Sequence, residues 1–174
     1  GAIEAQRERR DSKGEVVWLA SYPRSGNTLL RTIFKHNFGL DNYSLYNDRD
    51  DIGKYEAIRE FVGHQDGSWG VDWSDSGQVP RDVSHIEKLV DDKPVLIKTH
   101  SPFHPFYKEY KVIYVVREPR AVLTSYVAYK KNFPGSPMSD EDALNELVFD
   151  GDEMAGFWSE HVEGWLKNKK NNIL

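Results

Sequence analysis

The chain has 174 residues, a formal net charge of −5 and no cysteine. This length is sufficient for a single domain with its own core. The negative charge argues against broad nucleic-acid binding, which depends on Lys and Arg side chains that neutralise phosphates. The lack of cysteine excludes disulfides, thiol nucleophiles and cysteine-ligated metals, and it favours a reducing compartment such as the cytoplasm. No apolar run approaches the roughly 20 residues of a membrane span, so we expect no membrane contact.

The first part of the chain predicts an arm followed by a strand, a tight loop and a helix. Residues 1–14 are polar and charged without an apolar period, which predicts a flexible N-terminal arm and a domain over 15–174. An apolar run at 15–20, rich in β-branched and aromatic residues, predicts a buried strand. From Asn27 onward, apolar residues recur with the spacing of one helix face, and Gly39 would end that helix. These apolar residues are Leu29, Leu30, Ile33, Phe34 and Phe38.

The middle of the chain predicts two buried strands after an irregular stretch. Asp, Gly, Ser and Trp interrupt every period in residues 40–85, so we expect loop there, apart from a short helix near 54–62. The apolar runs at 94–98 and 111–117 show no polar alternation, which is typical of parallel strands covered on both faces. The sequence therefore predicts a three-layer α/β fold with a central, mostly parallel sheet.

Helices dominate the prediction for the remainder. Pro119 would open a helix directly after the strand at 111–117, and Ser139 with Asp142 forms a Ser-x-x-Asp helix start. Residues 157–167 predict an amphipathic helix whose two tryptophans belong to the core. We interpret residues 172–174 as the beginning of a further strand.

The loop at residues 21–28, which reads S-Y-P-R-S-G-N-T, has the features of a phosphate site. A tight glycine-containing loop between a strand and a helix gathers unpaired N–H groups at the positive end of the helix dipole. Compared with the pattern G-x-x-x-x-G-K-[ST], Ser21 replaces the first glycine and Asn27 replaces the lysine. Loss of that lysine argues against ATP or GTP hydrolysis, and Arg24 can supply a cation from another position.

Two further groups of polar residues follow predicted strands. Arg117 presents a fork suited to phosphate, and Ser125 lies about two helical turns later, so both can hold one anion. Lys98, Thr99 and His100 lie just past the apolar strand residues 94–97, at the sheet edge where open α/β proteins bind ligands. A histidine at that edge can act as a base. We expect the other histidines, His36, His64, His85, His104 and His161, to be surface or packing residues.

Together these motifs resemble those of sulfotransferases that use 3′-phosphoadenosine-5′-phosphosulfate (PAPS). The loop at 21–28 is similar to the family's T-Y-P-K-S-G-T-T, and the K-T-H at 98–100 and the Arg117–Ser125 pair occur in the family's order. The resemblance implies that the loop binds the 5′-phosphate and that Arg117 and Ser125 bind the 3′-phosphate. It implies that His100 is the base, while Lys98 and Arg24 assist departure of the bridging oxygen. The donor-binding residues that it implies in the loop are Arg24, Ser25, Gly26, Asn27 and Thr28.

The implied reaction is in-line transfer of a sulfuryl group from PAPS to a hydroxyl or amine, which leaves 3′-phosphoadenosine-5′-phosphate (PAP) and needs no metal. The acceptor would be a small or carrier-bound molecule, with no nucleic-acid or membrane partner. Leu29 stands where the family has an adenine-stacking tryptophan. We expect residues 15–174 to cover the N-terminal two-thirds of such a domain, without the C-terminal arginine-lysine-glycine loop. A non-catalytic nucleotide-binding module is therefore the alternative, and a P-loop kinase is a weaker one.

Overall fold

The computed structural model describes residues 15–44, 46, 79–80, 88, 90, 92–132 and 138–168. The expected arm at 1–14, the short helix near 54–62 and the strand beginning at 172–174 lie outside these described residues.

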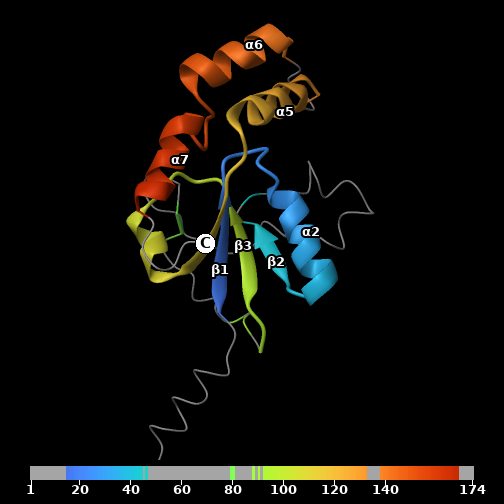
Figure 1. Cartoon of the computed structure of the whole chain (residues 1–174), viewed down its shortest axis with the longest axis vertical. Coiled ribbons are helices and arrows are strands. Elements are labelled where there is room, and N and C mark those ends of the chain that lie inside the picture. The colour runs from blue at the N-terminus through green and yellow to red at the C-terminus, as the bar shows by residue number, and fades with distance from the viewer. Residues whose placement is uncertain are drawn as a thin grey trace, which may run out of the picture. The chain divides into compact units, whose positions relative to one another are not determined.

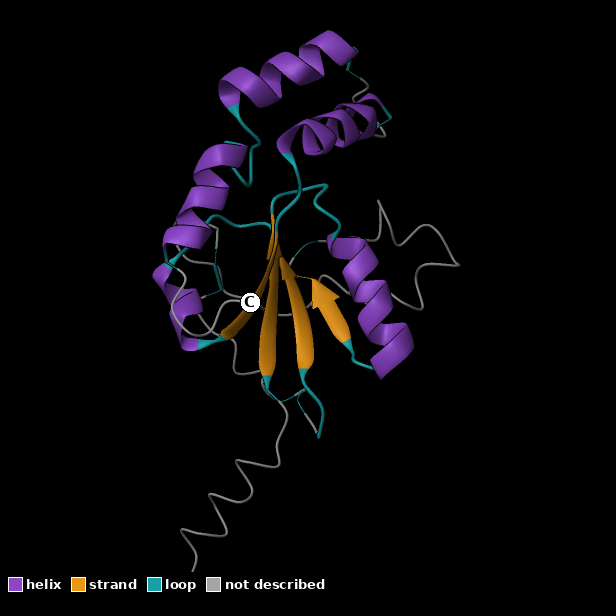
Figure 2. Cartoon of the chain, viewed as in Figure 1, coloured by secondary structure: helices purple, strands orange, loops and turns teal. Residues whose placement is uncertain are grey.

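Four strands form one sheet in the order β2-β3-β1-β4 (Figure 2). Their bounds are β1 Val16–Ser21, β2 Asn42–Ser44, β3 Val95–Thr99 and β4 Lys111–Val115. Every residue of β1 and β3 is buried, as their uninterrupted apolar runs predict. The strands expected at 15–20, 94–98 and 111–117 are thus confirmed, with ends that differ by one or two residues.

Strand β2 corrects the prediction of loop for this part of the chain. It pairs in parallel with β3, and Tyr43 lies opposite Ile97. The Nε atom of Arg31 donates to Oδ1 of Asn42 at 2.8 Å, which ties this strand to the preceding helix. Three residues are too few to show a hydrophobic period, so the sequence could not predict this strand. It forms through pairing with a strand that is distant in sequence.

The helices begin where the local signals place them (Figure 1). Their bounds are α2 Asn27–Phe38, α5 Pro119–Lys131, α6 Asp140–Asn145 and α7 Trp158–Lys167, with a 3₁₀ turn η2 Pro105–Glu109 and a π-helical turn η3 Glu146–Asp150. Pro119 is the first residue of α5, where its missing N–H has no consequence. The hydroxyl of Ser139 accepts the N–H of Asp142 at 3.1 Å, which confirms the predicted cap of α6.

The chain divides into two compact units, one made of residues 1–18 and 28–98 and the other of residues 19–27 and 99–174. The first unit holds β2 and nearly all of α2, and the second holds the loop after β1, β4 and the helices α5, α6 and α7. A single domain over 15–174 stays a prediction.

Helix α2 buries a charged residue, whereas part of its apolar stripe is exposed. Leu29 is 64% exposed and Phe38 is 60% exposed, whereas Arg31 is fully buried. The hydrogen bond from Arg31 to Asn42 makes this burial tolerable, because a buried guanidinium without a partner is costly. The helical spacing predicted the helix correctly, but it did not identify the buried side.

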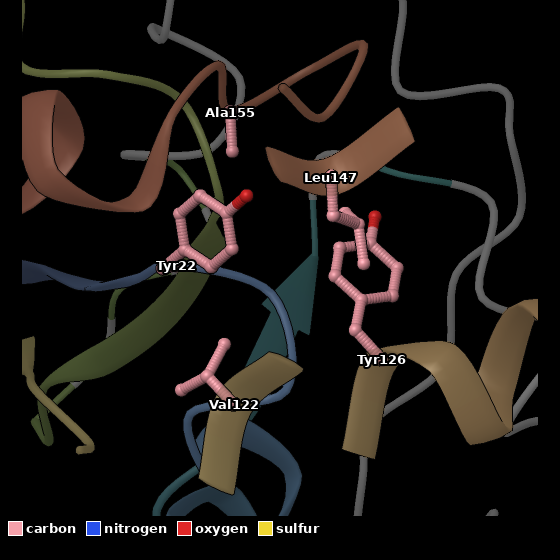
Figure 3. Close-up of a cluster of buried hydrophobic side chains, with 5 residues drawn as sticks. All are labelled: Tyr22, Val122, Tyr126, Leu147 and Ala155. Atoms are coloured by element: carbon pink, nitrogen blue, oxygen red, sulfur yellow. The ribbon is translucent and has the colours of Figure 1, made fainter. Parts of the chain in front are cut away.

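In the second unit, a hydrophobic cluster joins the loop after β1 to the helical part of the unit (Figure 3). Its members are Tyr22, Val122, Tyr126, Leu147 and Ala155. The ring of Tyr22 meets that of Tyr126 edge-on, with 6.4 Å between the centroids. An ion pair between Lys130 and Glu146 also joins α5 to η3. Leu147 comes from η3 and Ala155 from the turn that follows it, so packing fixes the loop on the helical layer of this unit.

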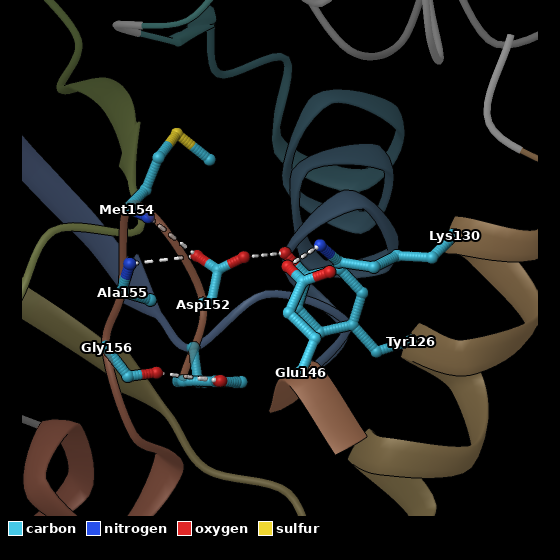
Figure 4. Close-up of polar contacts among 8 residues, drawn as sticks. Tyr126, Lys130, Glu146, Asp152, Met154, Ala155 and Gly156 are labelled. Atoms are coloured by element: carbon cyan, nitrogen blue, oxygen red, sulfur yellow. Dashed lines mark hydrogen bonds and ion pairs between the residues drawn. The ribbon is translucent and has the colours of Figure 1, made fainter. Parts of the chain in front are cut away.

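The turn before α7 is organised by one buried carboxylate (Figure 4). Asp152 accepts the N–H groups of Met154 at 3.0 Å and Ala155 at 2.8 Å, and its other oxygen accepts the hydroxyl of Tyr126. The main chain of Asp152 also pairs with that of Gly156 through bonds of 2.9 and 2.8 Å. Both oxygens of the Asp152 carboxylate therefore accept hydrogen bonds, and these bonds hold the turn.

Candidate functional site

The loop between β1 and α2 has the backbone geometry of a tight anion-binding turn. The N–H of Ser25 bonds to the carbonyl of Tyr22 at 3.2 Å and closes the turn. Arg24 has φ 65° and Gly26 has φ 105°, so two positions of the loop adopt the left-handed region. Glycine suits the second position, whereas Arg24 is strained there. Such strain is common at functional sites.

Two side chains anchor this loop from the inside. The hydroxyl of buried Tyr22 donates to the carbonyl of Gly156 at 3.0 Å. The Nδ2 atom of Asn27 donates to the carbonyl of Leu19 at 3.0 Å and to the hydroxyl of Ser21 at 3.2 Å. The side-chain amide nitrogen of Asn27 is therefore directed at β1, although the sequence interpretation placed this residue on a phosphate.

The same loop contains buried polar atoms without a hydrogen-bond partner among the described residues. The hydroxyl of Ser25 and Oδ1 of Asn27 are buried, and neither makes a hydrogen bond within the part of the chain that the structure describes. A buried polar group without a partner costs about 1–3 kcal/mol, and such groups in native structures call for an explanation such as a ligand. The hydroxyl of Ser25 can donate to an anion.

Three of the predicted donor-binding residues meet in the second unit. Nη1 of Arg117 donates to the carbonyl of Arg24 at 2.9 Å, and Nε of Arg24 donates to the hydroxyl of Ser125 at 3.3 Å. The guanidinium of Arg24 also lies over the ring of Tyr129, 5.0 Å from its centroid. Ser125 and Tyr129 are one turn apart on α5, so they share a face of that helix. Two arginines and one hydroxyl thus come together from the loop, the end of β4 and α5.

The ring of His100 is oriented by the last residue of β1. Its Nδ1 lies 2.7 Å from the carbonyl oxygen of Ser21 and 3.3 Å from the hydroxyl of the same residue. Because a carbonyl oxygen only accepts, Nδ1 carries the proton, and in the neutral ring the lone pair is on Nε2. This is the tautomer that a general base working through Nε2 requires.

Helix α7 contributes a residue that the motifs did not select. The ring of His161, which we expected at the surface or in packing, is buried and contacts the carbonyl of His100 through Nε2 at 3.1 Å. Its spacing from Trp165, i and i+4 on a predicted amphipathic helix, indicated a buried position. Nothing in the sequence indicated the polar contact.

Lys98 and Thr28 belong to the first unit. Lys98 is buried, and its Nζ lies 5.6 Å from the ring centroid of Tyr46. Thr28 stands in the first turn of α2, and its carbonyl accepts the hydroxyl of Thr32 at 2.9 Å. Lys98 lies within β3 and not just past the strand as the sequence predicted, because the strand continues to Thr99. Thr28 lies in the first turn of the predicted helix.

No group of three His, Asp or Glu residues that could hold a metal occurs within the described ranges. Among the helices in the described part of the chain, none is long and apolar enough to cross a membrane.

The succession of strand β1, tight loop and helix α2, together with the parallel pairing in the sheet, defines a P-loop-like α/β protein. The fold is similar to that of mouse sulfotransferase SULT7A1 complexed with PAP, with a TM-score of 0.56 and 23% identity over 92% of this chain and 50% of that one. It is also similar to retinol dehydratase in a complex with retinol and PAP, with a TM-score of 0.52 and 20% identity over 91% of this chain and 53% of that one. The predicted fold class is thereby confirmed.

The chain belongs to the sulfotransferase domain family, whose model matches residues 15–174. It is 32% identical to human sulfotransferase 2A1 over 98% of this chain and 56% of that protein. It is 35% identical to human sulfotransferase 2B1 over 99% of this chain and 44% of that protein. The chain thus spans about half the length of the curated relatives it matches. The predicted family resemblance is confirmed.

Proposed function

We propose that this chain binds PAPS and transfers its sulfuryl group to a hydroxyl or amine acceptor by in-line displacement. The observation that carries the proposal is the meeting of Arg24, Arg117 and Ser125 beside the loop after β1. Two guanidinium groups and a hydroxyl from three segments suit a ligand with more than one phosphate. Both similar structures are complexes with PAP, which supports the same ligand class.

The residues of the loop fit the 5′ end of such a donor. The buried hydroxyl of Ser25 has no hydrogen-bond partner in the described ranges and can donate to a phosphate oxygen. Gly26 and Thr28 add main-chain N–H groups at the start of α2, and Thr28 adds a hydroxyl. The side-chain amide nitrogen of Asn27 is bonded to β1, so we assign this residue a contact through its main-chain N–H. Arg117 and Ser125 would hold the 3′-phosphate.

In the proposed reaction, His100 moves a proton and two cations stabilise charge. PAPS supplies the sulfuryl group and a bisphosphate leaving group. Nε2 of His100 accepts the proton of the acceptor hydroxyl or amine while the acceptor atom forms its bond to sulfur and the bond between sulfur and the bridging oxygen of PAPS breaks. Lys98 and Arg24 stabilise the negative charge left on the bridging oxygen, and each such contact is worth about 3 kcal/mol. The acceptor proton thus ends on His100.

Calorimetry with PAP and AMP tests the donor assignment, because the two ligands differ in the 3′-phosphate. We expect tighter binding of PAP, and we expect Arg117→Ala to reduce that preference about 10–100-fold, the value of one charge-assisted contact. Arg120→Ala is the matched control, since Arg120 is an exposed arginine of α5. Equal affinities for PAP and AMP would refute the roles of Arg117 and Ser125.

An acceptor panel with radiolabelled PAPS tests the transfer step. Labelled product with a phenol, alcohol or amine supports the proposed function. A preference for PAP without transfer to any acceptor would instead support a non-catalytic binding module.

A further inference from the structure

Two side chains of α7 bind consecutive carbonyls of the segment that carries His100. Nε2 of His161 lies 3.1 Å from the carbonyl oxygen of His100, and Nε1 of Trp165 donates to the carbonyl of Ser101 at 3.2 Å. Since a carbonyl accepts only, the His161 ring donates its Nε2 proton. His161 and Trp165 are 1% and 0% exposed, so water does not compete for these bonds. One turn of α7 therefore holds the main chain of residues 100 and 101.

The opposite side of the His161 ring is also fixed. Nδ1 lies 2.8 Å from the hydroxyl of Tyr114 on β4, and because Nε2 carries the proton, Nδ1 accepts from that hydroxyl. Burial lowers the pKa of His161 to about 4, which keeps the ring neutral at ordinary pH. Burial also raises the pKa of Tyr114, which keeps the phenol protonated and able to donate. The tautomer of His161 is thus set by its partners.

Both the ring and the main chain of His100 are consequently held by hydrogen bonds. Its ring bonds to the carbonyl of Ser21 at the end of β1, and its main chain bonds to His161. Loss of the second bond removes the His161 donor from the His100 carbonyl, while Trp165 still binds the neighbouring carbonyl of Ser101, so we expect the peptide of residue 100 to rotate more easily. Rotation of the main chain would move the ring away from Ser21.

We propose that His161 is a positioning residue that holds the main chain of His100. The His100 ring then keeps its Nδ1–H hydrogen-bonded to the carbonyl of Ser21, and its lone pair stays on Nε2. The expected effect of His161 on turnover rests on the proposed function. Its effect on the orientation of the His100 ring concerns this chain alone. A His161 that serves only in packing would tolerate replacement by an aromatic ring of similar size.

The variants His161→Phe and His161→Gln separate these two roles. The centroid of the His161 ring lies 5.8 Å from that of Tyr114 and 5.5 Å from that of Tyr22. Phenylalanine fills the same space and keeps this packing, but it cannot donate a hydrogen bond. Glutamine can place an amide N–H near the position of Nε2. His36→Phe is the matched control, because His36 is an exposed histidine of α2.

Hydrogen exchange of the His100 ring N–H, measured by NMR, is the direct readout. It requires no ligand, and His100→Gln identifies the signal. In His161→Phe we expect at least about tenfold faster exchange, together with turnover that falls about 10–100-fold, as expected for a displaced reacting group. PAP affinity from calorimetry should stay within about twofold. His161→Gln should recover most of both losses, and His36→Phe should change neither.

Unchanged exchange in His161→Phe would overturn the proposal, and so would equal losses in both His161 variants accompanied by a lower melting temperature. If His161→Phe fails to fold, Tyr114→Phe decides, because it removes only the hydroxyl that sets the His161 tautomer. We expect it to change exchange in the same direction by a smaller factor, and no change would refute the inference. If the wild-type chain turns over no acceptor, the proposed function fails while the exchange comparison still tests the role of His161.

Discussion

Replacement of Arg24 by glycine and, separately, by alanine tests the backbone geometry of the proposed phosphate loop. Both variants lose the Nε contact with Ser125 and the packing on Tyr129, so these losses cancel when the two are compared. What remains is the cost of placing a Cβ at φ 65°.

The difference between the two variants follows from that angle. A residue with a Cβ in the left-handed region costs about 1–2 kcal/mol, which glycine avoids. Glycine gives back about 0.4–1 kcal/mol because it is more flexible in the unfolded chain. The free energy of unfolding of Arg24→Gly should therefore exceed that of Arg24→Ala by about 1 kcal/mol, which is a Tm difference of about 2–4 °C for a chain of this size.

Urea and thermal unfolding followed by circular dichroism measure this difference, and calorimetry with PAP measures the function. Both variants should lose PAP affinity to a similar degree, because both lack the guanidinium. If Arg24→Ala equals or exceeds Arg24→Gly in stability, Arg24 does not adopt the left-handed conformation and the loop geometry described above is wrong.

Three further predictions concern catalysis, metals and pH. His100→Ala should lower turnover by about 10²–10⁴-fold with PAP affinity nearly unchanged, because a general base acts on the acceptor proton. His36→Ala is the control. Wild-type turnover in His100→Ala would place the base elsewhere. EDTA should change neither PAP binding nor transfer, and a metal dependence of either would contradict the proposed scheme. Because burial lowers the pKa of His161 from 6.5 to about 4, the folded state binds fewer protons than the unfolded state between these values. The stabilisation from neutral His161 is complete above pH 6.5 and is lost as the pH falls toward 4. In urea unfolding, the free energy of unfolding of the wild type should therefore fall by about 3 kcal/mol more than that of His161→Gln over this range. Parallel pH dependences of the two free energies would contradict the assignment.

The sequence predicted the elements whose signals are local. Pro119 opens α5, and Ser139 caps α6, because a fixed φ and a side-chain acceptor act within one helical turn. The buried strands β1 and β3 could be predicted because a short, continuous apolar run is typical of a parallel strand that is covered on both faces. The same locality exposed the loop at 21–28 as a candidate site.

The sequence could not predict features that depend on distant partners. Strand β2 exists through its pairing with β3, and the burial of Arg31 depends on Asn42, which a helical period does not reveal. The contact of His161 with the carbonyl of His100 joins residues 61 positions apart. No pattern within α7 encodes the position of that carbonyl.

The sequence by itself determined the order of strand, loop and helix, the family and the candidate residues, since each depends on side chains that are near one another in the chain. The tertiary structure alone decided which of those side chains meet and which atoms they use. It directed the amide of Asn27 inward to β1, brought Arg117 to the carbonyl of Arg24, and fixed the proton of His100 on Nδ1. Hydrogen bonds require distances near 3 Å and defined directions, and only the folded backbone supplies these between segments that are far apart in sequence.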